Sequence, residues 1–325
     1  MCSSWDHGTD GILCGMLLVV LTYALSWEAA RGHVHNHNQH ESCTALDRRG
    51  CSYANARPEA ETSEFTWSRC TIARIPWPRN SNDLPLGAEP YIVQSPPWWN
   101  QVTAKNLERD KLLQSMANVT CTPSQAGSKR IGNFEMTLAE YLTEWLPKPV
   151  SRNAEENRYV FGEFGDQWAP LRDEYVLPPC EVCSRDSAAV TIGLGGMYSG
   201  APWHFHNSAF VEVFHGAKHF SFLPPSDKKA IDEIEKVMQF NASMSQIHWY
   251  LEQKPLLEER HLLKNMLECV VHPGEILYFP DNWHHGVVNL GNYTAFVSSF
   301  INTDLAKKSR APERPRHDWP KLLPP

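Results

Sequence analysis

The sequence predicts a mainly β protein, an antiparallel two-sheet or barrel-like domain with helices before it and a helical insertion within it. With 325 residues, 42 % of them apolar, the chain is long enough for a large hydrophobic core. From Arg158 onward, short runs rich in Val, Ile, Phe and Tyr alternate with Gly and Pro breaks, a pattern typical of sandwiches and barrels. Two segments with helical periodicity separate the first runs from the last.

The N-terminal segment 1–26 is expected to be a signal peptide. Its apolar run, Ile12 to Leu25, has 14 residues, fewer than the roughly 20 that a membrane crossing needs, and Ala24 and Ser26 have the spacing that signal peptidase favours. No Lys or Arg precedes the run, and Asp6 and Asp10 make its start acidic. An uncleaved signal anchor is therefore the second interpretation and a cytosolic start the third.

The remaining chain divides by composition. Residues 27–63 contain "HVHNHNQH" and are expected to be a flexible His-rich linker, with a metal-binding tail as the alternative. Residues 64–303 form the expected domain, with its β core at about 158–303 and the helical insertion at about 226–268. Its first part includes a strand in "EPYIVQSPPWW" and helices in "TAKNLERDKLLQSMA" and "MTLAEYLTEWL", the second of them capped by Thr137. The Pro-rich stretch 304–325 is expected to be a loose tail.

Glycosylation and cysteine patterns favour the secretory pathway. Three sequons begin at Asn118, Asn241 and Asn292. Of the 9 cysteines, seven remain after the leader, and an odd number leaves a free thiol or an intermolecular bridge. In an oxidising lumen, disulfide partners are expected among Cys43, Cys51, Cys70 and Cys121. The spacing of Cys180 and Cys183 favours a structural disulfide or two unrelated thiols over a redox motif, because no helix follows a strand there.

Two histidine pairs carry the chemistry. His204 and His206 are two residues apart, so on a β-strand both imidazoles would point to the same face, which makes half of a transition-metal site. About 80 residues downstream, a Pro-Gly turn and an aromatic strand lead to His284 and His285. The two half-sites share one metal only if the fold brings their strands side by side.

The segments around these pairs resemble the two halves of a jumonji-C (JmjC) domain. The resemblance rests on "GAKHFSFLPP" and "FPDNWHHGVVNL", extends over about residues 89–303, and is greatest to a member of the endoplasmic reticulum lumen. It implies a double-stranded β-helix, the jelly roll of the cupin class, that binds Fe(II) and 2-oxoglutarate. It also implies metal ligands at His204, His206 and His285, and it places Lys218 where many JmjC enzymes pair with 2-oxoglutarate. A surface lysine beside a hairpin glycine is the alternative for Lys218.

The ligand at His206 departs from the family pattern, which has Asp or Glu at this position. Three neutral imidazoles leave the charge of the metal uncompensated and suit Zn(II) as well as Fe(II), so Zn(II) or an empty site is also open. Glu212 is a less favoured source of the missing carboxylate. Ala201 stands where some members have Thr, which weakens the assignment of 2-oxoglutarate.

Three functions follow from these patterns. The favoured one is a non-catalytic binding or regulatory module with a degenerate His-x-His metal site. The alternative is a lumenal Fe(II)/2-oxoglutarate-dependent protein hydroxylase, and the third is a three-histidine cupin that oxygenates thiols. The expected partner is a protein of the secretory pathway. The net charge of -7 argues against nucleic acid, and a membrane would be reached only through an uncleaved leader.

Overall fold

A computed structural model describes most of the chain beyond residue 66. The described residues are 67, 69–78, 84–123, 135–148, 158–162, 165–238 and 246–301. The expected signal peptide, linker and Pro-rich tail lie outside them, as do Asn241, Cys43 and Cys51. None of the helices in the described part is both long enough and apolar enough to cross a bilayer.

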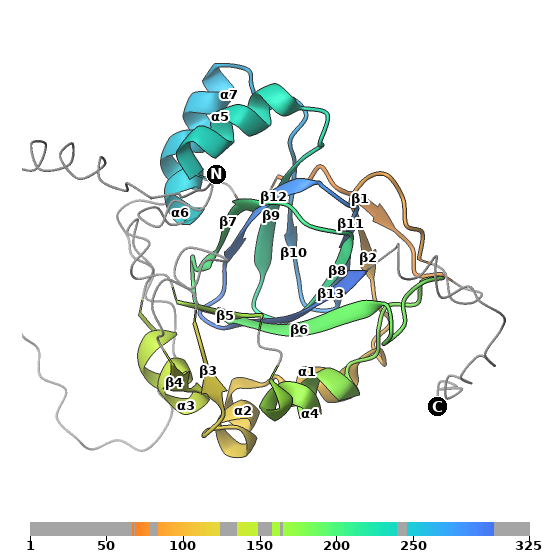
Figure 1. The fold of residues 1–325 in the computed structure, drawn as a ribbon, viewed down its shortest axis with the longest axis vertical. Helices are drawn as coiled ribbons and strands as arrows, with labels where there is room; N and C mark the ends of the chain where they lie inside the picture. The colour runs from red at the N-terminus through yellow and green to blue at the C-terminus, as the bar shows by residue number, and fades with distance from the viewer. Residues whose placement is uncertain are drawn as a thin grey trace, which may run out of the picture. The chain divides into compact units, whose positions relative to one another are not determined.

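Two β-sheets face each other (Figure 1). The larger has the order β1-β2-β11-β8-β13-β6-β5 and the smaller the order β10-β9-β12-β7. The strands of the larger sheet are β1 (Ala73–Ile75), β2 (Tyr91–Gln94), β5 (Tyr159–Phe161), β6 (Ala188–Gly195), β8 (Ala209–His215), β11 (Glu275–Phe279) and β13 (Thr294–Ile301). Those of the smaller sheet are β7 (Gly200–His204), β9 (Lys218–Leu223), β10 (Leu267–Val271) and β12 (His284–Asn289).

The path of the chain through these sheets is that of a jelly roll. From β6 to β9 and again from β10 to β13, each strand lies in the sheet opposite the one before it. Every pairing among these strands is antiparallel. The space between the sheets is filled from both sides, by residues such as Phe220 and Phe222 of β9 and Leu277 and Phe279 of β11. The cupin-class jelly roll that the resemblance implies is therefore confirmed.

The sequence analysis found strands β2, β5, β6, β8, β9, β11 and β13 but did not assign the other strands of the two sheets. β7 and β12 were treated as metal half-sites. The insertion expected at about 226–268 overlaps β10 by its first two residues, Leu267 and Glu268, because the helical periodicity continues through "LLKNML" to Leu267. Leu267 pairs with Phe222 of β9, so the strand begins at this residue. Tertiary pairing overrides local periodicity at this boundary.

Helices cover the larger sheet on its outer side (Figure 1). The expected helix at 103–117 is two helices, α1 (Gln101–Asn106) and α2 (Arg109–Ser115). The next begins as expected at Thr137, whose hydroxyl accepts a hydrogen bond from the Glu140 backbone N–H, and runs through α3 (Leu138–Glu140) and the π-helical η1 (Tyr141–Trp145). The short β3 (Thr120–Cys121) and β4 (Met136–Thr137) form a separate pair, and η3 (Asp166–Trp168) leads into α4 (Ala169–Glu174).

The insertion lies against the outer face of the smaller sheet. Its helices are α5 (Lys228–Met238), α6 (Gln246–His248), the π-helical η4 (Trp249–Gln253) and α7 (Lys254–Glu259). Their apolar side chains pack with Trp203 of β7, Leu223 of β9 and Val288 of β12. The last helix is shorter than its sequence pattern indicates, because His261 has a φ of 55° and turns the chain away.

Two disulfides join described residues, Cys70–Cys269 and Cys180–Cys183. The second shows that Cys180 and Cys183 are bonded and are not two unrelated thiols. The expectation for Cys121 is wrong, because its buried side chain belongs to neither bridge. The partner of Cys70 is Cys269, which lies 199 residues away in β10 and was not among the expected partners.

Candidate metal centre

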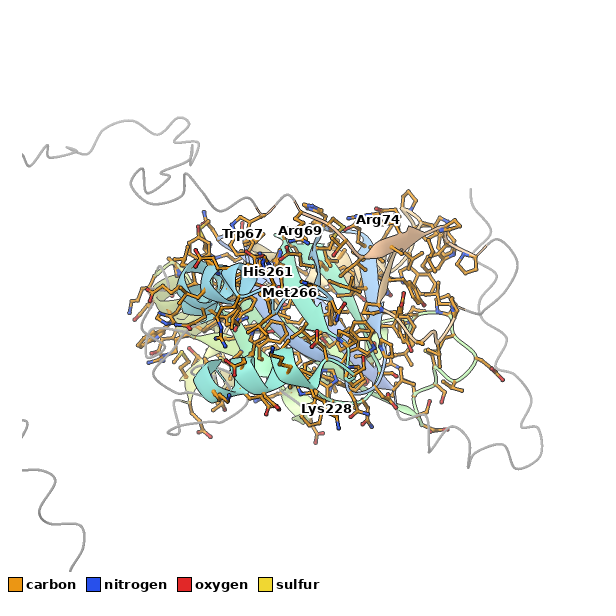
Figure 2. The ribbon with its side chains drawn as sticks, turned by 90° about the horizontal axis from the view of Figure 1, so that it is seen from above. Trp67, Arg69, Arg74, Lys228, His261 and Met266 are labelled. Atoms are coloured by element: carbon orange, nitrogen blue, oxygen red, sulfur yellow. A yellow bond between two sulfur atoms is a disulfide. The ribbon has the colours of Figure 1, made fainter. Side chains whose placement is uncertain are left out.

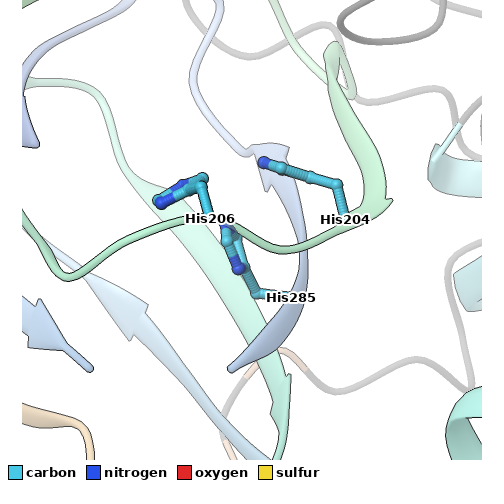
Figure 3. Close-up of side chains that lie close together, drawn as sticks. All are labelled: His204, His206 and His285. Carbon is cyan, nitrogen blue, oxygen red and sulfur yellow. The ribbon is translucent and has the colours of Figure 1, made fainter. Parts of the chain in front are cut away.

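Neighbouring strands bring the two histidine pairs together. β7 and β12 pair in antiparallel fashion, and His204 lies directly opposite His285 in the register. Figure 3 shows His204 at the end of β7, His285 on β12 and His206 on the segment that follows β7. His206 is therefore not on the strand, contrary to the expectation. The chain bends after His204, and the ring of His206 still approaches the other two.

The three rings surround one point. The ring centroids of His204 and His285 are 4.2 Å apart, those of His206 and His285 4.7 Å, and those of His204 and His206 5.5 Å. One nitrogen of each ring lies within 4.8 Å of those of the others. The arrangement suits one transition-metal ion bound by three imidazoles.

Backbone carbonyls orient all three rings. The Nδ1 atoms of His204, His206 and His285 lie 2.7, 2.6 and 2.9 Å from the carbonyl oxygens of Pro202, Asn207 and Trp283. A carbonyl oxygen only accepts hydrogen bonds, so each Nδ1 carries the proton and donates it. Each Nε2 is then the unprotonated nitrogen, which is the form that binds a metal, and fixing it through the opposite nitrogen is the usual second layer of a metal site.

Burial keeps the three imidazoles neutral. It lowers the pKa of His204 to about 4, with the neighbouring His206 as the next cause. Burial also lowers the pKa of His206, and it lowers that of His285 well below its ordinary value, helped by both neighbouring histidines. At neutral pH no proton has to be displaced before a metal binds.

Glu212 does not complete this site. Ala209 and Val211 of β8 line the cavity beside the histidines, so the side chain of Glu212, one position further along the strand, points to the other face of the sheet. There it accepts a hydrogen bond of 2.9 Å from Asn100 Nδ2. Burial raises the pKa of Glu212 to about 8.

Lys218 lies in the same cavity as the histidines. Its side chain is buried, which excludes the surface interpretation. Its Nζ donates to Tyr159 Oη at 2.9 Å and to Asn289 Oδ1 at 3.2 Å and lies 4.0 Å from the centre of the Phe296 ring. Burial lowers the pKa of Lys218 well below its ordinary value.

The sequence analysis did not single out Tyr159 or Asn289. Tyr159 lies in a segment assigned only as a strand, and Asn289 is the polar end of "GVVN". A polar residue among the apolar residues of a buried strand was the available signal, because such a residue needs a partner inside the fold.

The cavity between the histidines and Lys218 is small and aromatic. Its volume is about 30 Å³, room for one or two water molecules. Its aromatic lining residues are Tyr159, Phe161, Phe220, Phe279, Phe296 and Phe300. Small-molecule sites typically have about 300–1,000 Å³. In this conformation the cavity is too small for 2-oxoglutarate.

Comparison with known proteins agrees with this architecture. A family profile for a cupin-like domain matches residues 89–305. The chain is 31% identical over 195 residues to JmjC domain-containing protein 8 of Mus musculus, which covers 59% of this chain and 67% of that protein.

More distant relatives carry names of enzymes. Lysine-specific demethylase JMJ21 of Arabidopsis thaliana is 28% identical over 60% of this chain and 21% of its own length. The 2-oxoglutarate and iron-dependent oxygenase JMJD4 of Mus musculus is 24% identical over 36% of this chain and 27% of its own length. By the span of the cupin-like match and the similarity to JmjC proteins, this chain belongs to the cupin-like JmjC domain family.

Proposed function

We propose that this protein is a metal-binding JmjC protein of the secretory pathway whose jelly roll serves as a binding or regulatory module for protein partners. The observation that carries the proposal is the contrast inside one cavity. Three imidazoles are oriented toward a common point, whereas the space beside them measures about 30 Å³ and has aromatic walls.

The residues present fit a metal ion. His204, His206 and His285 would hold it through Nε2, because their Nδ1 atoms are engaged by carbonyl oxygens. A set of neutral nitrogen ligands suits Zn(II) at least as well as Fe(II), since divalent zinc binds imidazole more tightly. Bound Zn(II) would serve as a structural link between β7, the segment after it and β12.

The secretory location has two supports. The disulfides Cys70–Cys269 and Cys180–Cys183 are of the kind that persists in oxidising compartments. The sequon residues Asn118 and Asn292 are exposed, as glycan attachment requires. An expected signal peptide at residues 1–26 would deliver the chain there.

A second candidate is an Fe(II)/2-oxoglutarate-dependent protein hydroxylase of the endoplasmic reticulum lumen. Lys218 favours it, because its buried amino group shares the cavity with the histidines and has Tyr159 and Asn289 as polar neighbours. Fe(II) with 2-oxoglutarate supplies the oxidising chemistry that hydroxylates C–H bonds. For this function the aromatic side chains would have to move away from Lys218 before the cosubstrate binds.

Metal analysis and a cosubstrate titration separate the two candidates. The full chain is purified from a secretory host, its metal content is measured, and 2-oxoglutarate is titrated with Fe(II) present while succinate is monitored. The module predicts close to one equivalent of metal and neither 2-oxoglutarate binding nor succinate. Saturable binding with succinate formation would establish the hydroxylase instead, and a folded protein without metal affinity would contradict both.

A further inference from the structure

The Cys70–Cys269 disulfide lies in the wall of a second cavity, which shares no lining residue with the histidine site. This open cleft has a volume of about 470 Å³ and is lined by both cysteines together with Arg69, Arg74 and His272. Figure 2 shows Arg69 and Arg74 along the same side of the molecule. A disulfide is thus accessible to a small molecule beside two guanidinium groups.

Arg74 contacts both sulfur atoms. Its Nη1 donates to Cys70 Sγ at 2.9 Å and lies 3.6 Å from Cys269 Sγ. Its Nε and Nη2 atoms lie 3.2 and 3.1 Å from Glu275 Oε1, an ion pair that fixes the orientation of the guanidinium. A cation at this distance stabilises a thiolate that forms when the disulfide opens.

The two sulfurs differ in access. The side chain of Cys70 is exposed, whereas Cys269, with 1% of its surface accessible, is buried in β10. An incoming thiolate must approach along the S–S axis, so it reaches Cys70 and displaces Cys269. The leaving sulfur, Cys269 Sγ, is then the buried one, and it lies 3.6 Å from Arg74 Nη1.

The charge of the cleft selects the thiol. Arg69 pairs with Glu268 at 3.4 Å and Glu258 at 3.8 Å, and Arg74 pairs with Glu275, but each guanidinium has more N–H donors than these carboxylates use. Guanidinium groups bind carboxylates in preference to cations. A thiol that carries a carboxylate is therefore favoured over a cationic one.

The second disulfide offers an internal reference. Cys180 is 8% exposed, and Arg185, the arginine nearest to it in sequence, donates to the carbonyl oxygens of Asp173 and Tyr175. Both disulfides react with the same thiol in the same sample. The ratio of the two rates of adduct formation therefore does not depend on the intrinsic reactivity of the thiol.

We propose that the Cys70–Cys269 disulfide is a thiolation site for small anionic thiols. The thiolate attacks Cys70 Sγ, the S–S bond to Cys269 breaks, and a new S–S bond joins the reagent to Cys70. Cys269 leaves as a thiolate beside Arg74, and the proton that the reagent lost to solvent balances the charge, so no other oxidant or reductant is needed. The modification releases the covalent link between β10 and the segment before β1. Two hydrogen bonds also join them: the Thr71 N–H donates to the Glu268 carbonyl oxygen, and the Glu268 N–H donates to the Thr71 hydroxyl.

The test uses the oxidised full chain and two small thiols of opposite charge, 3-mercaptopropionate and cysteamine. Mass spectrometry of peptides measures the rate of adduct formation at each cysteine. With 3-mercaptopropionate, the adduct is expected on Cys70. It should form about tenfold faster than at Cys180 or Cys183, because one hydrogen bond to the charged sulfur stabilises the thiolate by about that factor. With cysteamine, the ratio of the two rates is expected to be smaller.

Substitutions of Arg74 test whether its guanidinium causes the faster reaction at Cys70. R74Q is expected to lower the rate of adduct formation at Cys70 about tenfold. R74K keeps the positive charge but lacks the planar guanidinium, so it should lower this rate less. R260Q is the matched control, since it breaks an arginine–glutamate pair of 2.7 Å with Glu233 in the insertion. An adduct on Cys269, equal ratios for both thiols, or an R74Q rate equal to that of R260Q in folded protein would overturn the proposal.

Discussion

The two ends of the cavity between the sheets differ in where their polar groups find hydrogen-bond partners. At one end lie three histidines, His204, His206 and His285. The Nδ1 of each donates a hydrogen bond to a backbone carbonyl, and the other ring nitrogens converge on one point. At the other, Lys218 Nζ already donates to Tyr159 and Asn289 and lies against the Phe296 ring. The histidine end is arranged for a ligand from outside, whereas the lysine end finds its partners within the chain.

This difference separates two properties that JmjC oxygenases combine. Metal affinity depends on imidazole geometry, which the pairing of β7 with β12 sets. Cosubstrate affinity depends on free volume beside the lysine, which the aromatic side chains occupy. The same fold can keep the first property and lose the second, because different residues determine them.

Removing the histidine end should have the largest effect. With H204A and H285A combined, one ligand of three remains, and metal binding should weaken at least about a thousandfold, because each lost ligand removes a strong bond. Metal content after dialysis measures this. The control is H215A, whose imidazole Nε2 contacts the Ala104 carbonyl at 2.8 Å outside the site. Retention of metal by the double variant would place the metal elsewhere.

Emptying the lysine end should have the next largest effect. F296A removes a buried ring and should lower the free energy of unfolding by about 3–5 kcal/mol. It should also admit 2-oxoglutarate beside Lys218, which calorimetric titration of the folded variant would detect. F210A removes an equally buried ring from a different hydrophobic cluster and controls for destabilisation. If F296A binds no 2-oxoglutarate while it is folded, free volume is not what limits cosubstrate binding.

How far the sequence predicts the fold differs between these regions. The β runs after Arg158 are apolar enough to be recognised, and the likeness to JmjC proteins identifies the jelly roll and the histidines. β10 was not predicted, because its strand conformation depends on pairing with β9 rather than on a strand pattern in its own sequence. The bend after His204 and the Cys70–Cys269 bridge likewise depend on contacts that are remote in sequence.

The sequence also did not predict that aromatic side chains fill the cavity beside Lys218. Gly193 of β6 allows the Phe296 ring to pack closely against the backbone. A Cβ atom there would lie 2.0 Å from the Phe296 ring, so the absence of a side chain at 193 lets the ring occupy its place. Which ring would use that space could not be predicted, because side-chain packing is set by the whole core.

Glu212 should give a pH dependence that neither end of the cavity causes. Its folded pKa of about 8 exceeds the ordinary value of 4.5, so the folded chain holds a proton that the unfolded chain releases in this interval. The free energy of unfolding should therefore fall as pH rises from 4.5 to 8, by at most about 1.4 kcal/mol per pH unit. Denaturant titrations across this range should show a shallower slope for E212Q, which stays neutral. Parallel slopes for the two proteins would contradict the assignment.

The smallest expected effect concerns the choice of metal. H206D restores a carboxylate at the position where the family has one, which compensates part of the metal charge and provides the hard ligand that Fe(II) uses in two-histidine, one-carboxylate sites. The ratio of Fe(II) to Zn(II) affinity should rise about tenfold, measured by anaerobic competition with a chelator. H261D is the matched control, because residue 261 is exposed and its φ of 55° is one that Asp tolerates.

If H206D changes the metal preference but still shows no 2-oxoglutarate binding, the ligand set is not what prevents cosubstrate binding. The aromatic side chains around Lys218 then become the cause to test. If H206D alone brings 2-oxoglutarate binding, the two ends of the cavity are coupled through the metal and are not independent.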